Sequence, residues 1–549
     1  MSTIDRSPTI SRRTAVGTLA TSAAALGLAP SLAGAQDHTH HEATPEASPV
    51  AAPATPQDGT PMPVTTQELV QPELISSVDG ALNVELTCAI TEVDLGVGHP
   101  VMAWTYNGTV PGPTLEVRPG DWLNVHLVNN LPEIPEGQDP HIIDRPHAWT
   151  TTNLHTHGLH VSPSGNADNV FLELAPGDDM QLEIPLPLNE TGGFNWYHPH
   201  KHGGVCQQVR AGMAGGLIVR GEIDEVPEIA AAREQVMVLQ AIELGDDFTV
   251  PDPIPVPDPS QAFYPRTQIF YTVNGQYLPK VTMYPGEVQR WRLLNAAEGK
   301  FLSLHIQEHP FNVVAWDGLT MHEPEAQTDI MMSSGNRVEA LVKAGAPGIY
   351  EVVLTPGSSQ HPDMPGMDHS DIVDQADRSA ELKIRPIFYL EVVGDGEEMF
   401  LPETLPAYDP PIHDIVKTRL VRYTVERGPD GVEFLSFGID GKPYRPENTP
   451  YQMKLGTAEE WIVMNDTDPK YAEHAHALHI HVNPFKVTKV NGVILEKPYW
   501  RDTMALSGRD GDWFEMQMNI DDFTGLTVQH CHVLSHEDLG MMEAIEIVE

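Results

Sequence analysis

The stretch QHCHVLSHEDLGMM combines side chains that bind soft and borderline metal ions. The chain has only three cysteines, and one of them, Cys531, stands between His530 and His532. In a strand, residues i and i+2 point the same way, so the two imidazoles should face one side and the thiol the other. Cys531, His536 and Met541 supply a thiolate, an imidazole and a weak thioether, which are ligands of a trigonal copper site.

Histidine pairs separated by one residue recur far more often than chance predicts. With 26 histidines in 549 residues, about one such pair is expected, and the sequence has seven. Four segments stand out: NLHTHG, NWYHPHKHG, HAHALHIHVNPF and HCHVLSHEDLGMM. Surface or core histidines explain a single pair, but they do not explain four clusters of which one includes a cysteine. The pattern predicts several metal ions, and the segment HALHIH can provide the second imidazole of the thiolate site.

These four segments resemble the copper-ligand motifs of the multicopper oxidases, a family that includes laccases, bilirubin oxidases and cuprous oxidases. The motifs His-x-His-Gly, His-x-His, His-x-x-His-x-His and His-Cys-His-x3-His-x4-Met occur in that order, without a missing ligand. The resemblance covers about residues 66–549 and is to three-domain, laccase-like bacterial members. It implies an all-β fold of three cupredoxin-like domains, four copper ions, and an enzyme that reduces O2 with electrons from a donor.

By motif position, the resemblance also implies a role for each ligand. The mononuclear type 1 copper would be held by His476, Cys531, His536 and the axial Met541. The type 2 copper would be held by His155 and His479. The coupled type 3 pair would take His157, His198, His200, His481, His530 and His532. Electrons would pass from the type 1 site through Cys531 to the three other copper ions, where O2 becomes water.

Three further histidines, His160, His202 and His474, fall outside these positions. His202 could extend the second motif, although the family uses the pair just after Trp-Tyr. His474 could compete with His476, but only His476 gives the spacing of the third motif. We therefore expect His202 to lie beside the ligands rather than among them.

Two carboxylates, Glu537 and Asp168, stand at positions that resemble proton relays in family members. Reduction of O2 to water consumes protons, and a buried carboxylate near cationic copper can hold and pass them. An ordinary solvated carboxylate or loop cap is the alternative for each.

Two cysteines remain, Cys88 and Cys206, both in the first predicted domain. An exported protein can form a disulfide between them. Alternatively, Cys206 closely follows the second histidine motif and lies near the metal cluster as a thiol.

The elements that must position these residues are predicted to be short strands. Segments such as LNVELTCAI and WLNVHLVNN alternate apolar and polar residues and are broken by Gly, Pro and Asn. An internal repeat places Asn-Gly or Asp-Gly at 107–108, 274–275 and 440–441. In each copy a second glycine is followed nine residues later by an asparagine, at 129, 295 and 465.

Such a repeat predicts turn, strand, turn and strand three times over, and hence three related Greek-key β-sandwich domains. We place these cupredoxin-like domains at residues 66–225, 226–400 and 401–549, with the type 1 copper in the last.

The first 35 residues are typical of an export signal. Arg12 and Arg13 precede an Ala/Leu run that ends in Ala33-Gly34-Ala35, a small-x-small cleavage site. An ordinary secretory signal is the alternative to a twin-arginine signal, because Ala15 stands where a bulky apolar residue is usual. Either signal predicts a secreted or periplasmic protein.

Residues 36–65 are rich in Ala, Pro and Thr and predict a disordered tether. Cleavage after Ala35 would expose Gln36-Asp37-His38, which could bind Cu(II) or Ni(II) in a square-planar site or remain a solvated tail.

The charge balance limits the partners. Acidic residues outnumber basic ones 77 to 32, so the surface repels phosphate backbones and nucleic acid is not an expected partner. No segment after the signal is predicted to span a membrane, and we expect a monomer whose partners are a reducing substrate and O2.

The function favoured by these patterns is laccase-like oxidation of phenolic or similar organic donors. One alternative is a metallo-oxidase for Cu(I) or Fe(II) in copper tolerance. The segment 361–369 holds two methionines and two histidines, which suits an auxiliary Cu(I) site or a flexible polar loop. A non-enzymatic copper-binding or scaffold protein is the remaining alternative.

Overall fold

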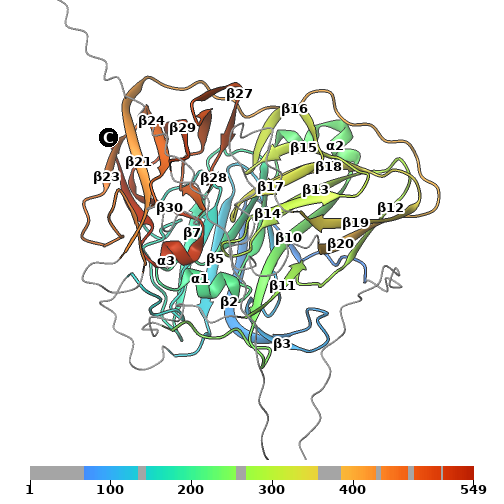
Figure 1. Cartoon of the computed structure of the whole chain (residues 1–549), viewed down its shortest axis with the longest axis horizontal. Coiled ribbons are helices and arrows are strands. Elements are labelled where there is room, and N and C mark those ends of the chain that lie inside the picture. Colours follow the sequence, from blue (N-terminus) through green and yellow to red (C-terminus); the bar gives the residue numbers. More distant parts are fainter. Residues whose placement is uncertain are drawn as a thin grey trace, which may run out of the picture. The chain divides into compact units, whose positions relative to one another are not determined.

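Strands dominate the chain and form six sheets within the described residues, two in each third (Figure 1). The computed structural model describes residues 67–133, 144–254, 267–355, 385–427, 435–467, 475–507 and 511–549. Apolar and polar residues alternate along many of these strands, as the buried and exposed positions of Trp122–Asn129 illustrate. The predicted all-β fold is therefore confirmed.

The first third contains a five-stranded and a four-stranded sheet. In spatial order, the five-stranded sheet consists of β1 (Leu74–Ser76), β4 (Thr114–Val117), β9 (Gly215–Val219), β8 (Gly193–His198) and β6 (His155–His157). The four-stranded sheet consists of β3 (Val101–Tyr106), β2 (Ala81–Val93), β5 (Trp122–Asn129) and β7 (Asp179–Pro185).

The middle third contains a six-stranded and a five-stranded sheet. The larger consists of β11 (Gln268–Val273), β10 (Arg233–Leu244), β13 (Val288–Asn295), β18 (Arg337–Lys343), β15 (Phe311–Trp316) and β16 (Leu319–Gln327). The smaller consists of β12 (Lys280–Met283), β20 (Arg385–Val392), β19 (Gly348–Leu354), β14 (Leu302–Ile306) and β17 (Asp329–Met332).

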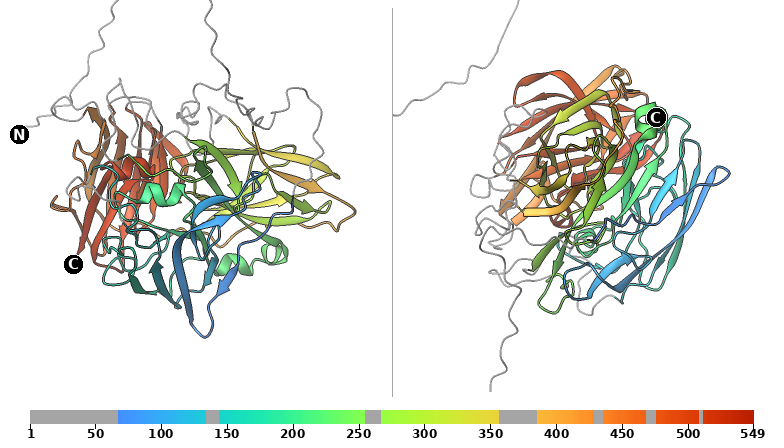
Figure 2. Two further views of the ribbon diagram at one scale, coloured as in Figure 1. Left: turned by 90° about the horizontal axis from the view of Figure 1, so that it is seen from below. Right: turned by 90° about the vertical axis from the view of Figure 1, so that its right-hand side faces the viewer.

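The last third repeats this arrangement. Its six-stranded sheet consists of β22 (Leu435–Ile439), β21 (Ile415–Arg427), β24 (Thr457–Asn465), β29 (Trp513–Ile520), β26 (Phe485–Val490) and β27 (Val493–Arg501). Its five-stranded sheet consists of β23 (Tyr451–Lys454), β31 (Met542–Val548), β30 (Gly525–Cys531), β25 (His476–Ile480) and β28 (Thr503–Leu506). Figure 2 shows the strands of each third grouped by colour, from blue through green and yellow to red.

Helices are few and short. The structure has α1 (Val205–Arg210), the 3-10 helix η1 (Glu222–Glu225), α2 (Pro227–Ala231) and α3 (Leu534–Asp538). Among the described residues, no helix has the length and hydropathy needed to cross a membrane.

The sequence repeat corresponds to one structural unit that occurs three times. The strands β5, β13 and β24 each end at the asparagine that closes the repeat, and each pairs in parallel with the strand β2, β10 or β21. The side-chain amides of Asn129, Asn295 and Asn465 each donate hydrogen bonds to backbone carbonyls of a neighbouring loop. The closing asparagine thus connects the end of its strand to a neighbouring segment by hydrogen bonds.

The Asn-Gly and Asp-Gly pairs form the predicted tight turns. Asn107 and Gly108 have φ of 54° and 76°, and Asp440 and Gly441 have φ of 53° and 74°. Two successive residues in the left-handed region define the turn that matches the twist of paired strands, which explains the residue types.

The proposed domain boundaries lie between sheets. β9 ends at Val219 and β10 begins at Arg233, while β20 ends at Val392 and β21 begins at Ile415. The three largest apolar clusters each lie mainly in one third of the chain. They include Trp104 in the first third, Trp291 in the middle third and Trp461 in the last. The boundaries near 225 and 400 remain a proposal consistent with this spacing.

Candidate metal centre

Two pairs of neighbouring strands carry most of the predicted ligands. β6 pairs with β8, which sets His155 opposite His198, and β25 pairs with β30, which sets His479 opposite His530. Since every second residue of a strand faces the same side, each His-x-His segment presents both imidazoles together. All the predicted histidine, cysteine and methionine ligands are buried.

The cysteine faces a different group from its two neighbours, as predicted. The Sγ of Cys531 lies 3.6 Å from Nδ1 of His476 and 3.7 Å from Nδ1 of His536, and these two nitrogens are 3.2 Å apart. A sulfur and two imidazole nitrogens at these distances form the donor set of a trigonal copper site. Met541 is fully buried in the same apolar cluster, and its carbonyl accepts a 2.9 Å hydrogen bond from the Cys531 amide.

The surroundings of this thiol keep it protonated unless a cation replaces the proton. Burial raises the pKa of Cys531 to about 12. A metal ion would exchange with that proton, because the thiolate is the form that binds metals.

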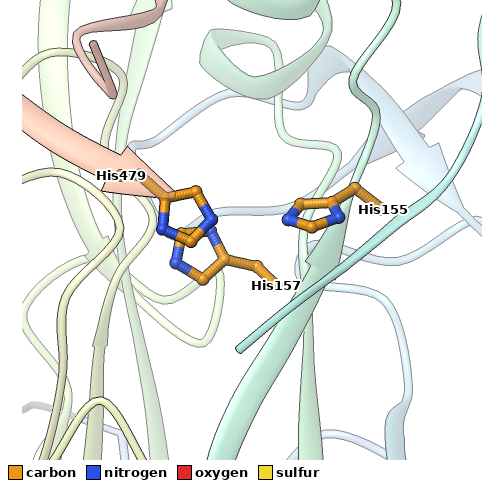
Figure 3. A group of neighbouring side chains, drawn as sticks. All are labelled: His155, His157 and His479. Carbon is orange, nitrogen blue, oxygen red and sulfur yellow. The ribbon is translucent and has the colours of Figure 1, made fainter. Parts of the chain in front are cut away.

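Eight other histidines converge in a second group that joins the first and last thirds of the chain. Within each of three sets, the donor atoms lie within 4.8 Å of one another. The sets are His155, His157 and His479; His157, His198 and His532; and His200, His481 and His530. Figure 3 shows the first set, in which the rings of His157 and His479 stack with centroids 3.7 Å apart.

The second nitrogen of several rings is held by the protein. Nδ1 of His155 lies 2.9 Å from Asp168, Nδ1 of His198 lies 2.8 Å from the carbonyl of Pro199, and Nδ1 of His479 lies 2.9 Å from the carbonyl of Asp502. The Nε2 atoms of these three histidines are buried and have no hydrogen-bond partner among the described residues. Fixing one nitrogen as donor leaves the other as a free lone pair, which is how proteins orient metal-binding imidazoles.

The electrostatics also favour metal binding. Burial, followed by the neighbouring imidazoles, lowers the pKa of five of these histidines well below the usual range: His157, His198, His479, His481 and His532. Burial lowers the pKa of both His200 and His530 to about 3. The rings are therefore neutral near pH 7, the protonation state in which imidazole is a ligand. These neutral, converging imidazoles fit bound copper.

Both predicted carboxylates lie against predicted ligands. Asp168 is buried beside His155 and also accepts a 2.8 Å hydrogen bond from the amide of Thr156. Although burial acts to raise it, the pKa of Asp168 is lowered by His155 and these hydrogen bonds. Glu537 is fully buried, with one oxygen 2.9 Å from Nδ1 of His530 and the other 3.4 Å from Nδ1 of His200. Burial raises the pKa of Glu537 to about 7.

A buried ionic network behind the second group had no signal in the sequence. Arg337, on β18 of the middle third, donates hydrogen bonds of 2.9 and 2.6 Å to the two carboxylate oxygens of Asp502. Asp317 accepts hydrogen bonds from the amides of Asp502 and Thr503. Because the carbonyl of Asp502 holds His479, the middle third positions a predicted ligand although it contributes none of them.

This network explains the glycine of the first motif. A Cβ at Gly158 would lie 2.3 Å from both Nη2 of Arg337 and Oδ1 of Asn195, and the residue has φ +98°. Only glycine combines this backbone conformation with such a close approach.

The additional histidines have other partners. His160 places Nδ1 2.8 Å from the carbonyl of Val482 and Nε2 3.0 Å from Asp522, so it links the first third to the last. The ring of His202 packs 4.9 Å from that of Tyr444 and belongs to none of the converging sets. His474, the 361–369 segment, the export signal and the tether lie outside the described residues.

No disulfide joins Cys88 and Cys206, so that alternative is wrong. Cys88 is buried in β2, whereas Cys206 lies in α1 and packs against Leu534 of α3. The Cys206 amide donates a 3.0 Å hydrogen bond to Asp538. Cys206 therefore lies close to the segment that carries His536, but its thiol belongs to none of the converging sets.

Comparison with known families is consistent with this geometry. Three family models, each described as "Multicopper oxidase", match residues 88–223, 243–368 and 411–549. Together they match well over half of the chain.

Individual relatives extend over most of the chain. A multicopper oxidase of Staphylococcus aureus is 24% identical over 460 residues, which cover 81% of this chain and 83% of the relative. A laccase of Bacillus stratosphericus is 24% identical over 504 residues, covering 84% and 94%. Among solved structures, a Campylobacter jejuni multicopper oxidase described as a metallo-oxidase superposes with a TM-score of 0.67 at 23% identity. That superposition covers 89% of this chain and 98% of the other, and it supports the three-domain cupredoxin-like fold.

Proposed function

The chain belongs to the multicopper oxidase family, whose members are copper-dependent oxidoreductases that use O2, and from this premise we propose that it is a laccase-like oxidase. In this proposal, a type 1 copper held by His476, Cys531, His536 and Met541 would accept single electrons from a phenolic or similar organic donor. The second histidine group would hold three further copper ions, which would supply the chemistry that reduces O2 to water. Bound copper supplies the redox chemistry, while the protein supplies ligands, orientation and access.

The observation that carries the proposal is the position of Cys531. Its sulfur converges with His476 and His536, while its chain neighbours His530 and His532 belong to two different histidine sets. One strand therefore connects the two groups by a few covalent bonds. An electron accepted on the cysteine side has a short path to the histidine side.

The converging sets support the ligand assignment implied by the motifs. The type 3 ions would be held by two complete sets: His157, His198 and His532 for one, and His200, His481 and His530 for the other. His155 and His479 remain for the type 2 ion, and His476, Cys531, His536 and Met541 for the type 1 ion. We propose four copper ions on this basis, and loading followed by metal analysis measures the number.

Exposure favours His536 as the place where the electron enters. Its side chain is 8% exposed, whereas His476 and Cys531 are fully buried. The ring of Phe437 stacks on His536 with centroids 4.4 Å apart. An electron donor can therefore reach the edge of the His536 ring but not the face that Phe437 covers. An aromatic donor would approach this edge.

The reducing substrate distinguishes the leading function from its alternative. Oxidation of Cu(I) or Fe(II) is the alternative, and the C. jejuni structural relative is described as a metallo-oxidase. A steady-state comparison of phenols, Cu(I) and Fe(II), with O2 uptake as the readout, tests both on copper-loaded protein. Higher kcat/KM for phenols supports the laccase-like function, and higher kcat/KM for a metal ion replaces it with the alternative. Copper content near zero after loading would overturn any oxidase function.

We further propose that Glu537 passes protons toward the site of O2 reduction. Its carboxyl group lies between His200 and His530, so it can hold a proton within hydrogen-bonding reach of the cluster. Glutamine keeps the shape of the side chain but cannot release that proton. We expect Glu537→Gln to slow reoxidation of the reduced protein by O2 by about tenfold or more, since positioned acids and bases contribute about 10²-fold or more.

Stopped-flow recovery of the blue absorption after mixing with O2 measures this effect. The exposed Glu496→Gln is the matched control and should reoxidise like the wild type. Anaerobic reduction of the type 1 copper should be unchanged in both variants. Wild-type reoxidation in Glu537→Gln would exclude the relay.

Asp168 has a different proposed part. Its carboxylate fixes Nδ1 of His155, so it positions a residue that would hold the type 2 copper.

We propose that the protein acts outside the cytoplasm as a monomer. The basis for the location outside the cytoplasm is the twin-arginine-like segment at residues 1–35. A fusion of that segment to a reporter tests export.

A further inference from the structure

A cavity of about 290 Å³ lies where residues of all three thirds of the chain meet. Its wall includes three buried histidines of the second group, His155, His479 and His481. The same wall includes Asn189 and Asp522, whose side chains are exposed to solvent. The cavity therefore connects the surface with the proposed type 2 and type 3 ligands and has room for several water molecules.

One carboxyl group in this wall, Glu190, is buried and incompletely bonded. Only 7% of Glu190 is exposed. Its Oε1 accepts a 3.3 Å hydrogen bond from the backbone amide of His160, and its Oε2 has no hydrogen-bond partner among the described residues. A buried carboxyl oxygen without a protein partner, in the wall of a cavity with room for water, is placed to bond with water.

The groups around Glu190 do not hold it in the ionised form. Burial raises the pKa of Glu190 to about 7, although His160 and the backbone amide of Thr191 act in the opposite direction. The His160 ring is itself bonded to Asp522 and to a backbone carbonyl. Burial raises the pKa of the Tyr408 hydroxyl, and the nearby Asp521 and Glu190 raise it further. No lysine or arginine lines the described wall of the cavity, so a proton on Glu190 has no fixed cation to displace it.

Reduction of one O2 to two water molecules consumes four protons along with four electrons, and all of these protons come from solvent. Glu537 and Asp168 contact ligands directly, but neither lines the cavity. Glu190 lines the cavity, and no hydrogen bond or ion pair between described residues joins it to a proposed ligand.

We propose that Glu190 is the proton-holding residue of this cavity, which takes protons from solvent and releases them through cavity water toward the site of O2 reduction. The inference rests on the proposed function, because it assigns a path for the protons of that reaction. The Oε2 of Glu190 carries the proton, and each proton released is replaced from bulk water.

The test compares Glu190→Gln with Glu183→Gln, an exposed carboxylate on β7. We expect Glu190→Gln to slow reoxidation of the fully reduced protein by O2 by about tenfold at pH 7, since proton transfer from a positioned acid contributes about 10²-fold or more. The wild-type rate should fall as pH rises through about 7, because the protonated form of Glu190 disappears. This inflection should be smaller in Glu190→Gln than in Glu183→Gln, where it should match the wild type, since Glu537 titrates in both variants.

A second readout does not depend on turnover. The infrared difference spectrum of copper-free wild type minus copper-free Glu190→Gln should contain the carbonyl band of a protonated carboxyl that titrates near pH 7, because Glu537 and Glu543 contribute equally to both proteins and cancel. Glu190→Asp, which keeps the carboxyl group, should retain an inflection in the reoxidation rate. These two measurements separate a proton-holding role from a loss of packing.

The outcomes are distinct. Unchanged reoxidation and an unchanged pH profile in Glu190→Gln, with normal wild-type turnover, would overturn this inference and leave the proposed function intact. Loss of the infrared band in Glu190→Gln, together with wild-type protein that binds copper but takes up no O2 with any donor, would overturn the proposed function instead. A difference spectrum of wild type minus Glu190→Gln without this band also counts against Glu190.

Discussion

Serine in place of Cys531 is expected to remove the blue absorption and the oxidase turnover together. The thiolate is the ligand that defines the type 1 site, and a serine hydroxyl neither ionises in that buried position nor binds copper comparably. Loss of a residue that merely supports a ligand costs about 10–100-fold in activity or metal affinity, so loss of this ligand should exceed about 100-fold in kcat. The second histidine group should still bind copper, because its donors are unchanged.

The matched control is Cys206→Ser. Cys206 is buried in α1 and belongs to none of the converging sets, so this variant should keep both colour and turnover. Visible absorption, O2 uptake and copper per chain measure the three effects. Blue absorption in Cys531→Ser would refute the assignment of the type 1 site.

Methionine in place of Arg337 should weaken the type 2 and type 3 sites and destabilise the fold. The Arg337 side chain is fully buried and bonds to both oxygens of Asp502, whose carbonyl holds His479. Removing one partner of a buried ion pair leaves the other charge uncompensated and costs about 3–5 kcal/mol. We expect the free energy of unfolding to fall by about this amount.

Copper should also be lost from the second group while the type 1 spectrum remains. Denaturant unfolding, metal analysis and electron paramagnetic resonance measure these effects separately. Arg233→Met is the control, since Arg233 is 50% exposed in its ion pair with Glu287 and should cost about 1 kcal/mol or less. A normal type 2 signal at full copper content in Arg337→Met would show that the middle third does not position His479.

The sequence was sufficient to predict which histidines and which cysteine converge, because their arrangement depends on local geometry. A His-x-His pair on a strand must present both rings to one side, and the residue between them must face the other. The placement of Cys531 away from His530 and His532 follows from that alternation alone. The turns and closing asparagines of the repeat are local signals in the same sense, which is why they located β5, β13 and β24.

The supporting residues could not be predicted in this way. Arg337 and Asp502 are separated by 165 positions, and neither stands in a motif, so only the fold brings them together. The same holds for Glu190, which depends on a cavity with walls from three parts of the chain. Sequence also could not decide between a disulfide and two thiols, because that depends on the distance between β2 and α1.

Copper should also act on this chain as a reversible cross-link. His200 and His530 approach within 3.2 Å across 330 positions of sequence, so one ion held by both closes a very long loop. Because copper binds the assembled site and not the separated segments of the unfolded chain, its binding free energy adds to the stability of the fold. Chelation should therefore lower the midpoint of thermal unfolding by far more than the loss of a few local contacts would.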